Sequence, residues 1–201
     1  MTTSTREKVL DLVQEAGILR PRDLEAHRIP RVYLSRLCRD GLLERVGRGL
    51  YRIADAPFTG QESYAEACKR VPRGVICLLS ALLFHDLTTQ LPRQLWMAIP
   101  TKAWHPRVDW PPLRIVRFSE ATLTVGVQRH SVGGAEVRVF SPAKTIADCF
   151  KYRNKIGLDV ALEALKDGWR DRLFTMDELG DYARVCRVQN VMRPYLAMLV
   201  V

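Results

Sequence analysis

The sequence has no pattern typical of a metal site, a disulfide framework or a phosphate-binding loop. Its five cysteines are odd in number and form no Cys-x-x-Cys pair, so we expect free and mostly buried thiols (Cys38, Cys68, Cys77, Cys149 and Cys186). No Gly-Lys-Ser/Thr loop is present either. We therefore expect no bound metal and no cofactor.

Signals for export or for membrane insertion are also lacking. Residues 1–8 are polar and do not resemble a secretory signal. The longest apolar stretch, Val75–Phe84, is interrupted by Ser80 and is too short to cross a bilayer. We therefore expect a cytoplasmic protein that has no membrane partner. Since no dimerising heptad appears either, we also expect a monomer in solution.

What the sequence does have is an excess of positive charge that is concentrated in one segment. The 201 residues have a formal net charge of +9. Between Arg20 and Arg52 there are nine arginines against four acidic residues, which is more than half of this excess. Because arginine suits both phosphates and guanine edges, this segment predicts binding to nucleic acid.

The first 54 residues have the pattern of a winged helix-turn-helix domain. Ser4 and Glu7 have the spacing of a capping box before a helix, and Pro21 can open a second, short helix. A third helix is predicted from Arg31 to Asp40. Two short strands, over 42–46 and 50–53, then flank Gly47-Arg48-Gly49, which predicts a hairpin that serves as the wing.

The third helix is the expected recognition helix. Its Leu34, Leu37 and Cys38 share one face and are expected to pack inward, and the opposite face is basic. The glycines beside Arg48 are expected to let the wing approach the duplex. The candidate DNA-binding residues are Arg22, Arg31, Tyr33, Ser35, Arg36, Arg39, Arg45 and Arg48. RNA is a less favoured ligand of this segment, which has few aromatic residues for stacking on bases.

After a linker over residues 55–62, residues 63–201 predict a larger mixed α/β domain with a helical C-terminal end, so the fold class is α+β. Val75–Phe84 is interpreted as a buried helix. Strands are expected over 95–99, 113–118 and 136–140, and helices after Ser141. The segment 102–112 is interpreted as an ordered loop anchored by Trp104 and Trp110.

Three charged groups of the second domain admit simple structural explanations. His85 is expected to cap the last carbonyls of a helix, since no catalytic partner lies at a recognisable spacing. Lys144 and Asp148 have the i, i+4 spacing of an ion pair. A possible second basic patch consists of Lys144, Lys151, Arg153 and Lys155. It either contacts phosphates or complements a helix dipole, and the sequence favours neither.

Several segments resemble the AbiEi family of antitoxins and transcriptional regulators of type IV toxin–antitoxin systems. In the first domain these are Gly-Leu-Leu-Glu-Arg over 41–45 and Gly-Arg-Gly-Leu-Tyr over 47–51, after the recognition helix. In the second domain, residues 80–88 and 141–150, followed by 153–157, are similar to the family's further motifs.

The resemblance implies a DNA-binding antitoxin without enzymatic activity. Its first domain would bind inverted repeats in the promoter of its own operon and repress it. Its second domain would neutralise a nucleotidyltransferase-like toxin, without needing a stable complex, and would support cooperative binding to DNA. Two alternatives remain: a nucleic-acid enzyme tethered by the winged helix, for which no metal-carboxylate array is recognised, and a ligand-sensing regulator without a toxin.

Overall fold

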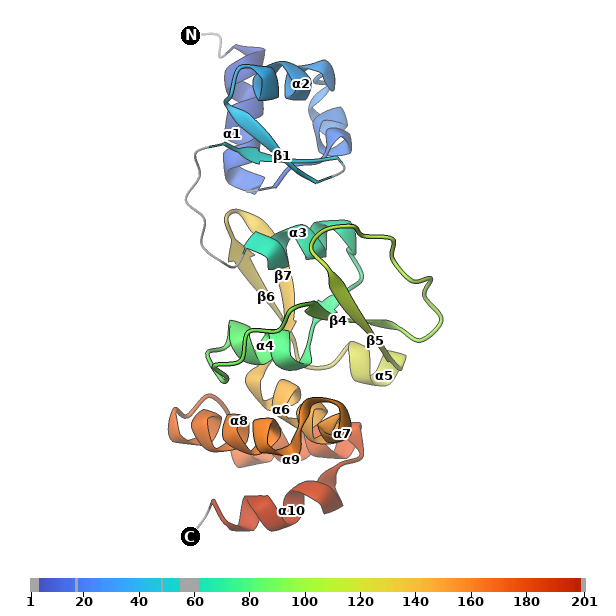
Figure 1. Cartoon of the computed structure of the whole chain (residues 1–201), viewed down its shortest axis with the longest axis vertical. Coiled ribbons are helices and arrows are strands. Elements are labelled where there is room, and N and C mark those ends of the chain that lie inside the picture. Colours follow the sequence, from blue (N-terminus) through green and yellow to red (C-terminus); the bar gives the residue numbers. More distant parts are fainter. Residues whose placement is uncertain (1–3, 17, 48, 55–61, 200–201) are drawn as a thin grey trace. The chain divides into compact units, whose positions relative to one another are not determined.

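The structure, a computed structural model, describes residues 4–16, 18–47, 49–54 and 62–199 (Figure 1). Backbone contacts divide the chain into two compact units. The N-terminal unit comprises residues up to 72 together with 108–111 and 130–137, and the second unit comprises the remainder. The predicted mixture of α and β structure is confirmed, whereas the domain boundaries at residues 54 and 63 stay predictions.

The N-terminal unit contains helices followed by a hairpin and a further helix. These elements are α1 (Thr5–Ala16), the 3₁₀ helix η1 (Pro21–His27), α2 (Val32–Arg39), β1 (Leu43–Gly47), β2 (Leu50–Ile53) and α3 (Glu62–Arg70). Strands β1 and β2 are antiparallel, and Leu19 forms a further bridge to Tyr51 of β2. The helices and the hairpin thus occur in the order that the sequence predicts.

Local signals in the sequence explain where these helices begin. The Ser4 backbone N–H donates to Glu7 Oε2 over 2.8 Å, and the Glu7 N–H donates to Ser4 Oγ over 3.2 Å, which confirms the capping box. Pro21 occupies the first turn of η1. One apolar cluster joins the helices to the hairpin; it consists of Val9, Val13, Leu19, Leu24, Ile29, Leu34, Leu37 and Leu43.

The rest of the chain combines a five-stranded sheet with helices. The elements are β3 (Val75–Ile76), α4 (Leu78–Phe84), β4 (Leu95–Pro100), β5 (Leu113–Phe118), α5 (Glu120–Leu123), β6 (Val127–Val132), β7 (Ala135–Phe140), α6 (Pro142–Lys151), α7 (Arg153–Ile156), α8 (Leu158–Arg170), α9 (Met176–Cys186) and α10 (Gln189–Ala197). The strand order is β5-β4-β3-β7-β6. Strand β3 is antiparallel to β4 and parallel to β7, and β4 is parallel to β5. No helix of the described residues is long and apolar enough to cross a bilayer.

Two predictions for this part of the chain were wrong in detail. Val75–Phe84 is not one helix, because Val75 and Ile76 pair with β4 as strand β3 before α4 begins at Leu78. Its uniformly apolar sequence does not distinguish a buried strand from a buried helix. Trp104 and Trp110 do not anchor the loop, since their side chains are 95% and 58% exposed.

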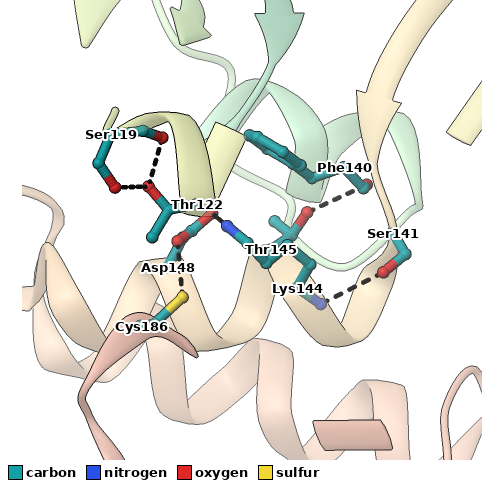
Figure 2. Close-up of polar contacts among 8 residues, drawn as sticks. All are labelled: Ser119, Thr122, Phe140, Ser141, Lys144, Thr145, Asp148 and Cys186. Carbon is teal, nitrogen blue, oxygen red and sulfur yellow. Dashed lines mark hydrogen bonds and ion pairs between the residues drawn. The ribbon is translucent and has the colours of Figure 1, made fainter. Parts of the chain in front are cut away.

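A buried ion pair on α6 connects helices of the second unit (Figure 2). Lys144 Nζ lies 2.5 Å from Asp148 Oδ2, and the two side chains are 0% and 1% exposed. The Cys186 thiol, at the end of α9, donates to Asp148 Oδ1 over 3.1 Å. The ammonium also lies 4.2 Å from the centroid of the Phe140 ring. The predicted i, i+4 pair is therefore confirmed, and it lies inside the core.

The neighbouring backbone is shaped around this pair. The Lys144 N–H donates to Ser141 Oγ over 3.4 Å, so Ser141 caps α6 as predicted. Thr145 Oγ1 donates to the Phe140 carbonyl over 3.2 Å. Gly126 has a φ of +69°, and a Cβ there would lie 2.8 Å from Lys144 Cβ. Glycine is therefore required beside Lys144 both for its backbone conformation and for its lack of a side chain.

Burial sets the protonation of the groups around Asp148. It raises the pKa of the Asp148 carboxyl above its ordinary value, while the Lys144 ammonium and the Cys186 hydrogen bond act in the opposite direction. Burial, together with the nearby Asp148 charge, also raises the pKa of Cys186 to about 12. The thiol therefore keeps its proton at neutral pH and can donate it to the carboxylate.

Lys144→Ala is expected to lower the free energy of unfolding by about 3–5 kcal/mol, because it leaves a buried carboxylate without its counter-ion. Replacing the pair with Lys144→Met and Asp148→Leu removes both charges at similar volume and is expected to be close to neutral. Urea denaturation followed by circular dichroism measures both values. Equal losses in the single and the double variant would show that charge burial is not the cause.

The stability of Lys144→Met is expected to increase as the pH is lowered. Without the ammonium, burial raises the folded-state pKa of Asp148 further. Since this pKa lies above the unfolded value, the folded state binds more protons between the two, and stability falls as the pH rises through that interval. Urea midpoints between about pH 4 and about pH 8 test this. The double variant, which lacks the carboxylate, is the control; a parallel pH profile in both would contradict the assignment.

Candidate nucleic-acid interface

The apolar side of α2 holds it in the N-terminal unit. Leu34 and Leu37 are buried, whereas Cys38 is only half-buried. Partial burial nevertheless raises the pKa of the Cys38 thiol, which favours its neutral form. The predicted inward face of the helix is thus observed, with Cys38 at its border.

The opposite side of α2 carries an exposed stripe, which we call the α2 stripe: Val32, Ser35, Arg36 and Arg39. Their i, i+3, i+4, i+7 spacing places them on one helix face. Val32 is 48% exposed and was absent from the candidates chosen from the sequence. Its i, i+4, i+7 spacing to Arg36 and Arg39 was the sequence signal that placed it on the same exposed face. An apolar side chain at this position suits contact with a thymine methyl group.

The other candidates lie at several places around the stripe. Arg22, Arg31 and Arg45 are exposed, and Arg31 is the N-cap residue of α2. Tyr33 is half-buried, with the Arg36 guanidinium 5.7 Å from its ring centroid. Arg48, the predicted tip of the wing, lies outside the described residues.

Ion pairing separates the arginines into two groups. Arg31 pairs with Glu25, and Arg22 Nε lies 3.8 Å from Asp23 Oδ1. By contrast, Arg36 and Arg39 have no carboxylate partner within the described ranges of the chain. The two arginines of the stripe can therefore bind an anion without first breaking an ion pair with a described carboxylate.

Arg45 and Arg52 have structural contacts in the hairpin. Arg45 Nε donates to the Gly47 carbonyl over 3.1 Å, which orients its side chain along the end of β1. Arg52 pairs with Glu44 of the opposite strand, and its Nη1 also lies 2.7 Å from Glu62 Oε2. Arg45 thus remains exposed, whereas Arg52 is ion-paired within the hairpin and to α3.

Gly47 has a structural role besides the one expected of it in the wing. A Cβ at this position would lie 1.5 Å from Arg70 Nη2 and 2.7 Å from Glu66 Oε1. Arg70 and Glu66 form an i, i+4 pair on α3 at 2.9 Å, and both side chains are largely buried. Gly47 therefore leaves room for a charged pair of α3. Of the two wing glycines, Gly49 has the positive φ, +69°, that a tight turn requires.

The possible second basic patch loses one of its four members. Lys144 is buried in its pair with Asp148, so its assignment to an exposed patch was wrong. Lys151 and Lys155 are exposed, and Arg153 is half-buried and donates to the Phe150 carbonyl over 2.9 Å. The remaining three cations lie at the junction of α6 and α7.

The side chain of His85 contacts the sheet of the second unit. His85 is the C-cap residue of α4, where its backbone N–H bonds to the last carbonyls, and its side-chain Nε2 lies 2.8 Å from the Phe140 carbonyl oxygen of β7, which connects α4 to the sheet. Within the described residues no group of three or more His, Cys, Asp or Glu side chains is arranged to hold a metal ion.

One family model matches the first part of the chain. Residues 7–54 match the family model of the AbiEi antitoxin transcriptional regulators. This AbiEi match spans α1 to β2 and so includes the α2 stripe. The parts of the resemblance in the second unit lie outside it. No curated protein matches the chain in sequence.

The fold of the whole chain has a counterpart among solved structures. The crystal structure of the RV2827C protein from Mycobacterium tuberculosis is similar over 98% of this chain and 82% of that one, with a TM-score of 0.54. The two sequences are 11% identical, so the likeness concerns the fold alone.

Gly47→Ala is expected to destabilise the protein by about 1–3 kcal/mol, because the new Cβ displaces Arg70 and leaves Glu66 buried without its cation. Thermal unfolding measures the effect. Gly180→Ala is the matched control, since α9 has open space at this position and alanine favours a helix by about 0.5–1 kcal/mol. A Gly47→Ala variant as stable as the parent would contradict the role assigned to Gly47.

Proposed function

We propose that the chain is a DNA-binding antitoxin of a type IV toxin–antitoxin system and a repressor of its own operon, without enzymatic activity of its own. The observation that carries this proposal is the α2 stripe, which presents Arg36 and Arg39, unpaired with any carboxylate of the described residues, on a helix fixed by a buried apolar face. The AbiEi match over residues 7–54 supports it.

In this proposal residues 1–54 act as a winged helix-turn-helix domain. Helix α2 enters the major groove of double-stranded DNA, where Arg36 and Arg39 contact base edges or phosphates and Val32 contacts a thymine methyl group. Arg31 and Tyr33 lie at the N-terminal end of the helix and contact the phosphate backbone of the DNA. The positive end of the helix dipole also attracts these phosphates. Arg22, Arg45 and Arg48 extend the contact beside the helix.

The proposed operator is a pair of inverted repeats in the promoter of the chain's own operon. The protein would be a cytoplasmic monomer that binds the repeats cooperatively. Residues 63–201 would neutralise a nucleotidyltransferase-like toxin without a stable complex. Lys151, Arg153 and Lys155 are proposed to contact phosphates beside the operator, because counter-ion release makes each such contact favourable.

Arg36→Ala and Arg39→Ala are each expected to weaken binding to the chain's own upstream DNA by about 1–3 kcal/mol, as expected for an arginine that contacts a base. Fluorescence anisotropy over a range of salt concentrations measures the affinity and its salt dependence. Both side chains are exposed, so circular dichroism is expected to show an intact fold.

Arg193→Ala is the matched control, because Arg193 is an exposed arginine on α10 of the second unit. It removes the same charge and is expected to leave the affinity close to that of the parent. The proposal is wrong if the parent shows no salt-sensitive binding to inverted repeats in this DNA. Binding that survives the Arg36 and Arg39 variants unchanged would instead reject α2 as the recognition helix.

A further inference from the structure

A second concentration of positive charge lies between residues 93 and 117, outside the proposed DNA interface. It contains five basic residues (Arg93, Lys102, Arg107, Arg114 and Arg117) against one acidic residue, Asp109. This excess of four and the excess of five between Arg20 and Arg52 equal the formal net charge of +9. The remainder of the chain is therefore balanced, and the second concentration needs its own explanation.

These five basic side chains are exposed but do not share one face, since Arg114 and Arg117 lie three residues apart on β5 and project from opposite sides of the sheet. None of the five has a carboxylate partner within residues 4–16, 18–47, 49–54 and 62–199. Arg114 is held in place, with its guanidinium 4.2 Å from the centroid of the buried Trp96 ring. Strand β5, which carries Arg114 and Arg117, is an edge strand of the sheet.

Trp104, in the connection between β4 and β5, presents a nearly bare aromatic ring beside these cations in the sequence. At 95% exposure it is the most exposed large apolar side chain of the described residues. The backbone that leads to it is fixed, since Arg117 Nη1 donates to the carbonyls of Thr101 and Ala103 over 2.8 and 2.7 Å. Presenting the ring thus requires little further ordering of the chain on binding.

We propose that Trp104, with Lys102 and Arg107 beside it along the chain and Arg117 hydrogen-bonded to the backbone that leads to it, binds single-stranded nucleic acid. An unpaired base would stack on the indole while the arginine and lysine side chains contact phosphates. The bases of a duplex are stacked on each other, so they offer the ring no face. An acidic protein could also pair with these cations. However, a tryptophan that anchors a protein interface is surrounded by contacts that exclude water. The residues next to Trp104 in the sequence include Lys102, His105 and Arg107, which are polar and exposed, and this favours nucleic acid over a protein ligand.

The inference is independent of the proposed DNA interface. It uses side chains of the second unit alone, and none of them belongs to the α2 stripe. The test therefore uses the full chain with Arg36→Ala and Arg39→Ala, which removes the proposed duplex-binding arginines. Failure of this inference would leave the operator-binding experiment unaffected.

The probes are fluorescein-labelled oligouridine and oligothymidine of about twelve nucleotides, within the site sizes of single-strand-binding modules. Both are expected to bind with a salt-dependent affinity. Trp104→Ala is expected to weaken binding roughly tenfold or more, since one stacked base contributes on that order. Trp104→Phe keeps an aromatic face and is expected to retain most of the affinity, and Arg193→Ala, which removes an unrelated exposed charge, is expected to retain all of it.

A second readout separates stacking from simple charge attraction. Tryptophan fluorescence is expected to be quenched on binding, and the quenching is expected to be much smaller in Trp104→Phe although this variant still binds. Stronger binding to oligouridine than to oligothymidine would identify RNA as the ligand, and equal binding would identify any single strand. Either result supports the proposal.

Three outcomes overturn the proposal. The first is absence of oligonucleotide binding at low salt, which is also what a protein ligand for Trp104 would produce. The second is equal affinity of Trp104→Ala and its parent for both oligonucleotides. The third is displacement of the labelled strand by a duplex of the same length as effectively as by an unlabelled single strand.

Discussion

The buried Lys144–Asp148 pair is the constraint on which the second unit depends. Two charges removed from water are tolerated only where geometry and hydrogen bonds compensate for the lost solvation. The Phe140 ring and the Cys186 thiol supply such contacts, and Gly126 leaves the space that Lys144 occupies. The burial of this pair therefore gives the segment Ser141–Phe150, prominent in the AbiEi resemblance, a role in folding, and the proposed toxin-directed role would have to come from exposed residues elsewhere.

The N-terminal unit combines both uses of charge. Its main core cluster is apolar, and the candidate arginines Arg22, Arg31, Arg36, Arg39 and Arg45 are exposed outside it. Other arginines are structural, since Arg52 joins β1, β2 and α3 through Glu44 and Glu62. Arginine content alone therefore overstates the binding surface. The useful distinction is whether a carboxylate of the described part of the chain already compensates the charge, as for Arg52, or not, as for Arg39.

The sequence was informative wherever a local rule decides the structure. Capping residues, such as Ser4 and Ser141, and helical apolar spacing indicated the helices, because both act within a few residues. Strand β3 was missed because pairing with β4, distant in the sequence, decides its conformation. The burial of Lys144 and the exposure of Trp104 and Val32 likewise depend on tertiary packing, which overrides what residue type and spacing suggest.

Whether an arginine is already ion-paired decides how its binding to a polyanion affects the folded protein. An arginine that leaves an internal carboxylate to meet a phosphate loses one ion pair as it gains another, whereas Arg36, Arg39 and Arg107 have no ion pair to lose among the residues that the structure describes. Their contacts with a polyanion would therefore be governed mainly by counter-ion release and would weaken steeply as salt increases. The pair inside the second unit is shielded from salt by its burial. Added salt is thus expected to weaken binding to nucleic acid while leaving the fold intact, because, of these two sets of charges, only the binding charges are exposed to it.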